Sequence, residues 1–412
     1  MPTGRRREPG VRSTVGAATS RALRERWLAW RIACAQGAAS GSATRGRMRR
    51  FCVIVAWLVA LTSATAGGLE ATAAGTEPAI VQTTYPFGDV DHFDPGRDYT
   101  PGERWSRLVE PEEAGWSRNR LADAVSFARD IGTDALLVVH AGLVVSAFGE
   151  VDAEFDLYSV RKSLMSVAFG VFVDRGVIDL EASLGDLGIN DLAGLTPREK
   201  TATVDDLLTS RSGVYHPAAY ETRRMREKRP ARGSYYPGEF WFYNNWDFNV
   251  LSTIFMKETG YDFFEAFARE VATPLNFEHF GLEDTRYYVD EDASRHPAYL
   301  FEMSALDLAR IGLLMLNNGE FNGHRILSRA WVEQSTSAIH VWDTDEPGAG
   351  YGYMWKVTPA GFYAAGAGAQ RVFVVPQDRI VIVHLANRRE EEKVRNDDVR
   401  ALYDLILQAY GG

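Results

Sequence analysis

Apolar residues recur along this chain with two different patterns, and each pattern predicts a different kind of element. Apolar residues at helical spacing predict helices, whereas short apolar runs bounded by turn residues predict strands. Ala141-Gly142 separates two such runs and signals a tight hairpin. The predicted helices are 118–131 (with Ser117 as N-cap), 305–318 and 397–410, and the predicted strands are 136–140, 143–148, 362–365, 371–375 and 380–386.

One further apolar run leads directly into a predicted core. The stretch 156–170 reads D-L-Y-S-V-R-K-S-L-M-S-V-A-F-G, and its residues from Leu164 to Phe169 predict a buried helix. We expect this helix to begin at Ser159, so that Lys162 stands one turn on and shares the same face. Short apolar pieces at 177–180 and 203–208 predict a helical lobe further along the chain.

Composition excludes some classes of function. The chain has 412 residues, 46% of them hydrophobic, so it can build a large core. Its net charge of −10 divides unevenly, because residues 1–66 carry +10 and the remainder carries −20. A body this acidic argues against nucleic-acid binding. Both cysteines, Cys34 and Cys52, lie in the N-terminal segment, so the body has no disulfide and no cysteine-based nucleophile or metal site.

The N-terminal segment has the pattern of an export signal. Met48-Arg49-Arg50 precedes an uncharged apolar run, 51–61, and small residues follow up to Ala66. The apolar run is shorter than a membrane span. We therefore predict an exported protein whose true start is Met48, with residues 1–66 forming a low-complexity extension and a signal peptide. Residues 67–111 are rich in Gly, Thr, Pro and Asp and are predicted to be a linker and surface wrap.

Ser159 and Lys162 form the only S-x-x-K pattern in the chain. A serine hydroxyl becomes a strong nucleophile when a neighbouring base takes its proton, and a lysine can do this when burial keeps it neutral. The free backbone N–H groups at a helix N-terminus can stabilise negative charge that develops nearby. Alone, the pattern also arises by chance, so its companions further along the chain decide its meaning.

Tyr243 and Asn245 form the only Y-x-N pattern, on a turn before an apolar helical run. An aromatic turn of this kind can simply fill a core, and an asparagine can simply cap a helix. Beside Ser159 and Lys162 they have a chemical interpretation as well. Tyr243 can pass protons between the serine and a leaving group, and Asn245 can hold Lys162 or the substrate by hydrogen bonds.

With these motifs in order, the body resembles the serine beta-lactamase and penicillin-binding superfamily, in its class C-like branch, which includes esterases, D-amino-acid peptidases and 6-aminohexanoate-dimer hydrolases. The resemblance runs from about Trp116 to Leu405 and includes framework stretches at 204–213, 237–251, 303–312 and 366–376. It implies an α+β fold over 112–412. An antiparallel sheet with flanking helices and a second, all-helical lobe would enclose the active site between them, and the first hairpin and the last strands would share one sheet.

The same resemblance implies roles for individual residues. Ser159 would be acylated, Lys162 and Tyr243 would act as the base pair, and water would release the acyl group. The oxyanion hole would consist of the backbone N–H groups of Ser159 and Gln370. The family needs no cofactor and no metal, and the sequence has neither an H-E-x-x-H motif nor a G-x-S-x-G elbow.

One family feature is absent from the sequence. The third motif, on the edge strand, usually has a Lys or His, then a small residue, then Gly; Ala367, Gly368 and Ala369 stand at the positions matched to it. Beta-lactams and carboxy-terminal peptides need a cation there to hold their carboxylate. We therefore expect a neutral ester or amide as substrate rather than a beta-lactam.

Several residues near these motifs are candidates for substrate contact. They are Tyr215, His216, Trp241, Gly368 and Ala369, and for the aromatic and histidine side chains packing is about twice as frequent a role as contact. His384 lies in an apolar strand and is expected to be a hydrogen-bonded core histidine. Three readings stay open: an exported serine hydrolase, an acyltransferase using the same acyl-enzyme, and a catalytically inactive binding or sensor protein. The sequence leaves the oligomeric state undetermined.

Overall fold

The structure is a computed structural model that describes residues 78–343, 348–387 and 394–411. These residues belong to one compact unit that begins at Thr76. The predicted signal peptide, the extension before Met48 and the first part of the predicted linker lie outside the described residues. Within the described ranges, no helix has both the length and the apolar character needed to cross a membrane.

The central sheet joins segments that are far apart in the sequence. The hairpin of β4 (Ala135–His140) and β5 (Leu143–Gly149) turns at Ala141 and Gly142, whose φ angles of 50° and 93° are those of a tight hairpin turn. β16 (Ile380–Leu385) pairs antiparallel with β4 along its whole length. The prediction that the first hairpin and the last strands share one sheet is therefore confirmed.

Among the described residues the sheet has eleven strands. The order β11-β12-β13-β14-β15-β16-β4-β5 is antiparallel throughout, and β3 and β2 extend it by parallel pairing. The other strands are β1 (Val81–Gln82), β2 (Gly88–Val90), β3 (Ser106–Leu108), β11 (His340–Val341), β12 (Gly350–Tyr351), β13 (Lys356–Thr358), β14 (Gly361–Ala365) and β15 (Arg371–Val375).

The segment expected to be only linker and surface wrap contributes strands β1, β2 and β3, which the sequence analysis missed. The predicted anchor Trp105 is fully buried there. The Tyr85 hydroxyl donates to Glu278 Oε2 (2.6 Å), and Glu278 Oε1 accepts from the buried Arg310 (2.6 Å). Arg310 also donates to the carbonyl of Gly102 (2.9 Å), so one buried network ties this segment to the body.

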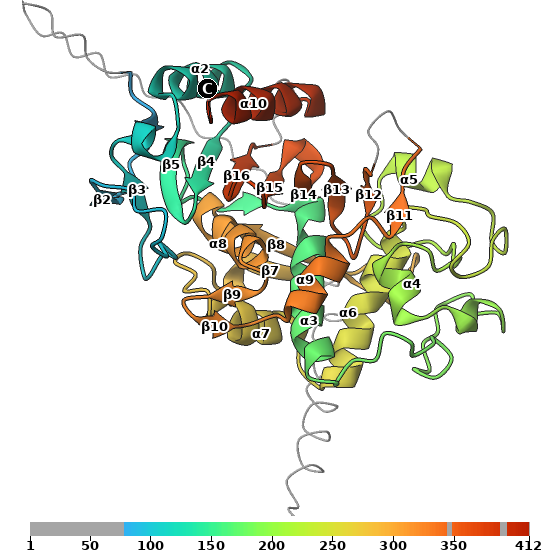
Figure 1. Ribbon diagram of the computed structural model, residues 1–412. Coiled ribbons are helices and arrows are strands. Elements are labelled where there is room, and N and C mark those ends of the chain that lie inside the picture. The colour runs from blue at the N-terminus through green and yellow to red at the C-terminus, as the bar shows by residue number, and fades with distance from the viewer. Residues whose placement is uncertain (1–77, 344–347, 388–393, 412) are drawn as a thin grey trace, which may run out of the picture. The chain divides into compact units, whose positions relative to one another are not determined.

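Both faces of the sheet are covered, because successive residues of its central strands are apolar and point to opposite sides. Leu136 and Val138 pack into one core with α2 (Arg118–Asp130) and α10 (Asn396–Gln408). Leu137 and Val139 pack into a larger core on the other side, which includes α8 (Ala305–Leu316). Figure 1 shows α2 and α10 side by side above the sheet and α8 below it.

Beyond α8 lies the predicted helical lobe. Its centre is α3 (Arg161–Asp174), in which all residues from 161 to 172 are buried. Phe172 packs edge-on against Phe255 of α6 (centroids 5.0 Å apart), and Gly170 lets Trp331 of α9 approach so closely that a β-carbon there would lie 2.4 Å from the indole. The remaining elements are α4 (Val204–Leu208), α5 (Arg223–Lys228), α6 (Asn245–Thr259), α7 (Phe263–Phe267), α9 (Arg329–Ser335), β6 (Phe155–Asp156), β7 (Thr285–Tyr288), β8 (Ala298–Met303), β9 (Glu320–Phe321) and β10 (His324–Arg325). The fold is α+β, as expected.

Candidate active site

Ser159 lies in a single 3-10 turn (Tyr158–Val160) between β6 and α3. The regular α-helix begins two residues later, at Arg161, so the expectation that it begins at Ser159 is wrong by that margin. Tyr158 has a φ of 48°, in the left-handed region that a tyrosine rarely adopts. The chain thus makes a sharp, strained entry into a fully packed helix, and Ser159 remains partly exposed at this corner.

Lys162 meets Ser159 as the sequence spacing predicts. Its Nζ donates a hydrogen bond to Ser159 Oγ at 2.9 Å. The ammonium position lies 4.7 Å from the ring centroids of both Tyr243 and Phe248, and the side chain is only 2% exposed. Burial, followed by the positive charge of Arg161 and then of Lys356, holds the pKa of Lys162 well below its usual range. Such surroundings favour the neutral amine over the ammonium.

Tyr243 approaches the same hydroxyl from the loop before α6. Its phenol is close enough to Ser159 for that hydroxyl to lower the pKa of Tyr243, and its ring lies 4.7 Å from Lys162 Nζ. Burial raises the pKa of Tyr243, while Ser159 and the charge of Arg161 act against that rise. Ser159, Lys162 and Tyr243 thus meet at one point, although 81 residues separate Lys162 from Tyr243 in the sequence.

Asn245 lies next to this point but does not bond to Lys162. It is the first residue of α6, and its Nδ2 donates to the carbonyl of Tyr220 at 2.8 Å. Its Oδ1 is buried and has no hydrogen-bond partner among the described residues. The preceding Asn244 caps the helix through the N–H of Trp246 and also donates to the carbonyl of Val214 (2.7 Å).

Gln370 lies against the segment that leads to Ser159. Its Nε2 donates to the carbonyls of Asp156 and Ala386, each at 3.0 Å, and its Oε1 accepts from the N–H of Ala386 at 2.9 Å. A β-carbon on Gly366 would lie 2.4 Å from the carbonyl oxygen of Leu157. The backbone of 366–370 therefore packs directly on residues 156–157, which brings the two expected oxyanion donors into one neighbourhood.

Ala367, Gly368 and Ala369 lie between the two strands that the sequence predicts at 362–365 and 371–375. They form a 3-10 turn between β14 and β15, and three more strands follow beyond β14, so these positions are not on an edge strand. Gly368 and Ala369 have φ angles of 76° and 67°, outside the range of an extended strand. The Ala369 methyl is buried in a small cluster with Val394 and Val399, so it faces the core rather than a substrate.

The aromatic candidates have different surroundings. Tyr215 packs edge-on against Tyr235 and Phe242, and its hydroxyl is buried with no partner among the described residues. Trp241 stacks on His340 (5.3 Å, 4° between planes) and meets Tyr351 edge-on. Tyr351 in turn lies edge-on to Tyr243 (6.3 Å). Trp241 therefore belongs to an aromatic cluster that reaches Tyr243, beside Ser159 and Lys162.

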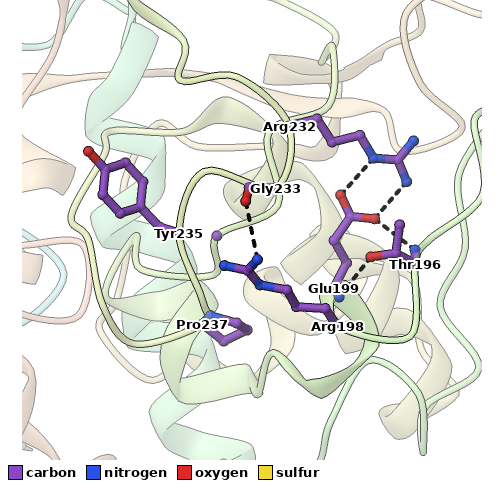
Figure 2. A pocket seen from close by; sticks show the side chains of 8 residues that line it. Thr196, Arg198, Glu199, Arg232, Gly233, Tyr235 and Pro237 are labelled. Carbon is purple, nitrogen blue, oxygen red and sulfur yellow. Dashed lines mark hydrogen bonds and ion pairs between the residues drawn. The ribbon is translucent and has the colours of Figure 1, made fainter.

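His216 is buried against a carboxylate, which indicates a role in packing. It is 2% exposed, and its Nε2 lies 3.2 Å from Glu199 Oε1. Arg232 donates to both oxygens of the same carboxylate (2.8 and 2.6 Å), and the resulting charge lowers the pKa of Glu199 to about 2 against the opposing effect of burial. Glu199 and Arg232, drawn in Figure 2, line a cavity. The cavity has a volume of about 300 Å³, and its lining includes Arg198 and Tyr235 but none of Ser159, Lys162 and Tyr243.

His384 is the hydrogen-bonded core histidine that the sequence suggested. It is fully buried, with Nδ1 3.0 Å from the carbonyl of Ala369 and Nε2 3.0 Å from Thr133 Oγ1. It supports the turn that precedes Gln370. In the ranges that the structure describes, no three His, Cys, Asp or Glu side chains gather as a metal site would require.

Two basic residues near the site were missed by the sequence analysis. Arg161, between Ser159 and Lys162, is buried. Lys356 on β13 lies 5.6 Å from the ring centroid of Tyr363, and burial followed by the charge of Arg371 lowers the pKa of Lys356 to about 8. The only available sequence signal was for Arg161, a charged residue within an otherwise apolar helical run.

Known proteins similar to this chain were found at the level of the family, of single curated proteins and of solved structures. The model of the Beta-lactamase family matches residues 118–405. Among curated proteins, the 6-aminohexanoate-dimer hydrolase of Paenarthrobacter ureafaciens is 27% identical over 341 residues, which cover 73% of this chain and 82% of the relative.

Solved structures share the fold at lower identity. A family VIII carboxylesterase has a TM-score of 0.52 and 16% identity, over 71% of this chain and 97% of that one. The octameric penicillin-binding protein homologue from Pyrococcus abyssi has a TM-score of 0.54 and 19% identity, over 70% and 76% of the two chains.

Proposed function

This chain belongs to the Beta-lactamase family, and from that membership and the geometry of the site we propose that it is a serine hydrolase that cleaves an ester or amide through an acyl-serine intermediate. The observation that carries the proposal is the meeting of Ser159, Lys162 and Tyr243. Lys162 Nζ donates to Ser159 Oγ at 2.9 Å and lies 4.7 Å from the Tyr243 ring centroid, and the pKa of the Tyr243 phenol is influenced by the same serine.

In the acylation step, the neutral amine of Lys162 takes the proton from Ser159 as Oγ forms a bond to the substrate carbonyl carbon. The resulting oxyanion is stabilised by the backbone N–H groups of Ser159 and Gln370. As the intermediate collapses, Tyr243 donates its proton to the departing oxygen or nitrogen and regains one from the Lys162 ammonium. The leaving group departs protonated, and the acyl group remains on Ser159.

In the deacylation step, water takes the place of the leaving group. Tyr243 with neutral Lys162 accepts a proton from the water as its oxygen attacks the acyl carbon. The second tetrahedral intermediate collapses, Ser159 Oγ regains a proton, and the acid is released. An alcohol or amine in place of water would give acyl transfer from the same intermediate, so the two activities differ only in the acceptor.

We propose a neutral ester or amide as the substrate class. Ala367, Gly368 and Ala369 provide no cation at the turn beside Gln370, and the aromatic cluster of Trp241, Tyr351 and Tyr243 offers apolar contact next to the reacting hydroxyl. The 6-aminohexanoate-dimer hydrolase and the carboxylesterase named above are amide- and ester-cleaving relatives by name, which supports both bond types.

We also propose that the protein is exported, with Met48 as the start and cleavage near Ala66. The support is the sequence alone: an arginine pair, an apolar run and small residues in that order. N-terminal sequencing of the natural product tests this proposal. A peptide that begins before Met48, or a mature form that keeps residues 51–61, would contradict it.

The test of the catalytic proposal uses a fluorophosphonate probe, which reacts covalently with activated serines. We expect labelling of the full chain at Ser159, and loss of labelling in Ser159→Ala. Ser166→Ala is the matched control, because Ser166 is buried on the same helix and its hydroxyl has no hydrogen-bond partner among the described residues. That control should label like the wild type. Folded wild-type protein that does not label would overturn the proposal and favour a binding or sensor role.

A substrate panel then separates the classes. p-Nitrophenyl esters, D-amino amides and nitrocefin are assayed with the wild type and Ser159→Ala, each with and without added alcohol or amine acceptors. We expect turnover of esters or amides above that of nitrocefin. Nitrocefin as the best substrate would reject the neutral-substrate assignment, and acceptor-dependent product would identify an acyltransferase.

A further inference from the structure

Arg161 is a buried arginine without a counter-ion. Arg161 is only 1% exposed, and none of its three guanidinium nitrogens has a hydrogen-bond partner among the described residues. Arg310, which is equally buried, shows what a structural arginine looks like in this chain. It pairs with Glu278 and donates to the backbone carbonyls of Gly102 and Leu275.

Two tyrosine rings replace the missing acceptors. The Arg161 guanidinium carbon lies 4.4 Å from the ring centroid of Tyr299 on β8 and 5.9 Å from that of Tyr220. The Tyr299 hydroxyl is near enough to feel the charge, since Arg161 opposes the rise that burial causes in the pKa of Tyr299, but it lacks the geometry of a hydrogen bond. Ring contacts offset only part of the cost of removing a charged guanidinium from water, so a contribution to stability does not explain this residue.

The position of Arg161 in the site suggests what it does. It stands between Ser159 and Lys162 in sequence, at the first position of α3. Every element around Lys162 faces it with a neutral or positive group: Ser159 from the turn, the rings of Tyr243 and Phe248 from α6 and its preceding loop, and Lys356 from β13. Within the described residues, no carboxylate forms an ion pair with Arg161 or Lys162.

The acidic groups nearest to this arrangement are held elsewhere. Asp156, which acts on Tyr220, pairs with Arg286 (2.9 Å), and Arg286 also pairs with Glu302. The positive charge of Arg161 is therefore not neutralised locally, and it acts on the adjacent Lys162.

We propose that Arg161 is a positioning residue of the active site, whose uncompensated buried charge keeps Lys162 in the neutral state that can accept the Ser159 proton. The inference rests on the proposed function, because it assigns Arg161 a role in that reaction.

The direction of the electrostatic effect agrees with this role. After burial, Arg161 is the larger of the two cationic influences that lower the pKa of Lys162, and Lys356 is the smaller. Arg161 also acts against the rise in the pKa of Tyr243 that burial causes. Removing the charge should therefore raise both pKa values, and the protonated, inactive form of Lys162 should persist to higher pH.

The experiment measures the rate of Ser159 phosphonylation and the kcat/KM for an ester as functions of pH, for the full chain and its variants. Arg161→Met and Arg161→Gln remove the charge, and Arg161→Lys keeps it. In the neutral variants we expect the acidic limb of both profiles to move to higher pH by about one pH unit or more. A nearby charge changes a pKa by about 1–3 pH units. Arg161→Lys should restore most of the wild-type position. Lys356→Met should move the limb in the same direction by less.

The outcomes are distinct. A neutral variant that is folded by circular dichroism and slower at every pH, with its limb unmoved, would show a merely structural role and overturn the proposal. Equal limb positions in Arg161→Lys and Arg161→Met would do the same. Wild-type protein that is not labelled at Ser159 would refute the proposed function instead. Using two neutral side chains of different polarity keeps the test decisive when one of them fails to fold.

Discussion

Gln370 and Asp156 are joined by a hydrogen bond from the Gln370 side-chain amide to the Asp156 carbonyl, 3.0 Å long, three residues before Ser159. The same amide also binds the carbonyl and N–H of Ala386. One side chain therefore fixes the turn at 367–369 both to the sheet and to the corner that carries Ser159. The backbone N–H of Gln370 is positioned by its own side chain.

This relationship predicts the effect of Gln370→Ala. The backbone N–H is retained, but its position is no longer fixed, and we expect kcat to fall by about 10²-fold, near the effect of losing one oxyanion donor. Gln370→Glu keeps an acceptor for the N–H of Ala386 and loses the donors to both carbonyls, so it should be similarly impaired. Steady-state kinetics check this. A folded Gln370→Ala enzyme with normal kcat would mean that the turn holds its place without the amide.

Tyr243→Phe should lower kcat while sparing the fold. The change removes the hydroxyl that lies beside Ser159 and keeps the ring that packs against Lys162 and Phe248. General acid–base groups contribute about 10²–10⁴-fold, and we expect a loss in kcat of that size. The matched control is Tyr351→Phe, which alters the ring beside Tyr243 without touching Ser159. Comparable losses in both variants would argue that packing, rather than proton transfer, is being measured.

Lys162→Met should stabilise the folded protein, increasingly so at lower pH. The pKa of Lys162 is lowered on folding, so the unfolded chain binds one more proton in the interval between the folded and unfolded pKa values. The free energy of unfolding therefore decreases as pH falls through that interval, by about 1.4 kcal/mol for each pH unit that the interval spans. Denaturant unfolding of the variant and the wild type at a series of pH values checks this. A difference in stability that is independent of pH would indicate that Lys162 is protonated in the folded state.

His384 should weaken the fold in acid. Burial lowers the pKa of His384 to about 4 from its usual 6.5, with the nearby Arg371 acting in the same direction. The neutral folded form contributes fully above pH 6.5, and its contribution is lost as pH falls from 6.5 to 4, by about 3 kcal/mol. His384→Gln should reduce that loss of unfolding free energy, which denaturant unfolding at a series of acidic pH values measures. His140, whose pKa burial also lowers to about 4, is the comparison: His140→Gln should reduce the remaining acid loss.

The sequence was informative where local spacing determines structure. The apolar runs in 136–148 and 371–386 predicted strands because both faces of those strands are buried, and an i, i+3 spacing placed Lys162 beside Ser159 without knowledge of the fold. Tyr243 was found through the only Y-x-N pattern in the chain, and the resemblance of the whole body to a family supplied its role beside Ser159, since no local rule relates the two residues.

Other features depend on distant partners and leave no local pattern. Strands β1, β2 and β3 have two or three residues each, too few for any periodicity. β1 and β3 are strands because β5 lies beside them, and β2 is a strand because it pairs with β3. The bond of Asn245 to the Tyr220 carbonyl depends on a loop whose course the sequence does not define. A charged residue in a helix ordinarily predicts an exposed face, so the burial of Arg161 required Tyr299, 138 residues away, to be in place.

Because β16 pairs with β4, the central sheet cannot be completed until nearly the whole chain has been synthesised. β4 emerges from the ribosome early, and its outer edge has no partner until residues 380–385 have been synthesised and inserted beside it. Until then it exposes unsatisfied backbone groups in a highly apolar strand, a template for aggregation. Residues 380–385 therefore close an edge that is otherwise prone to aggregation, and truncation before Ile380 should yield insoluble material.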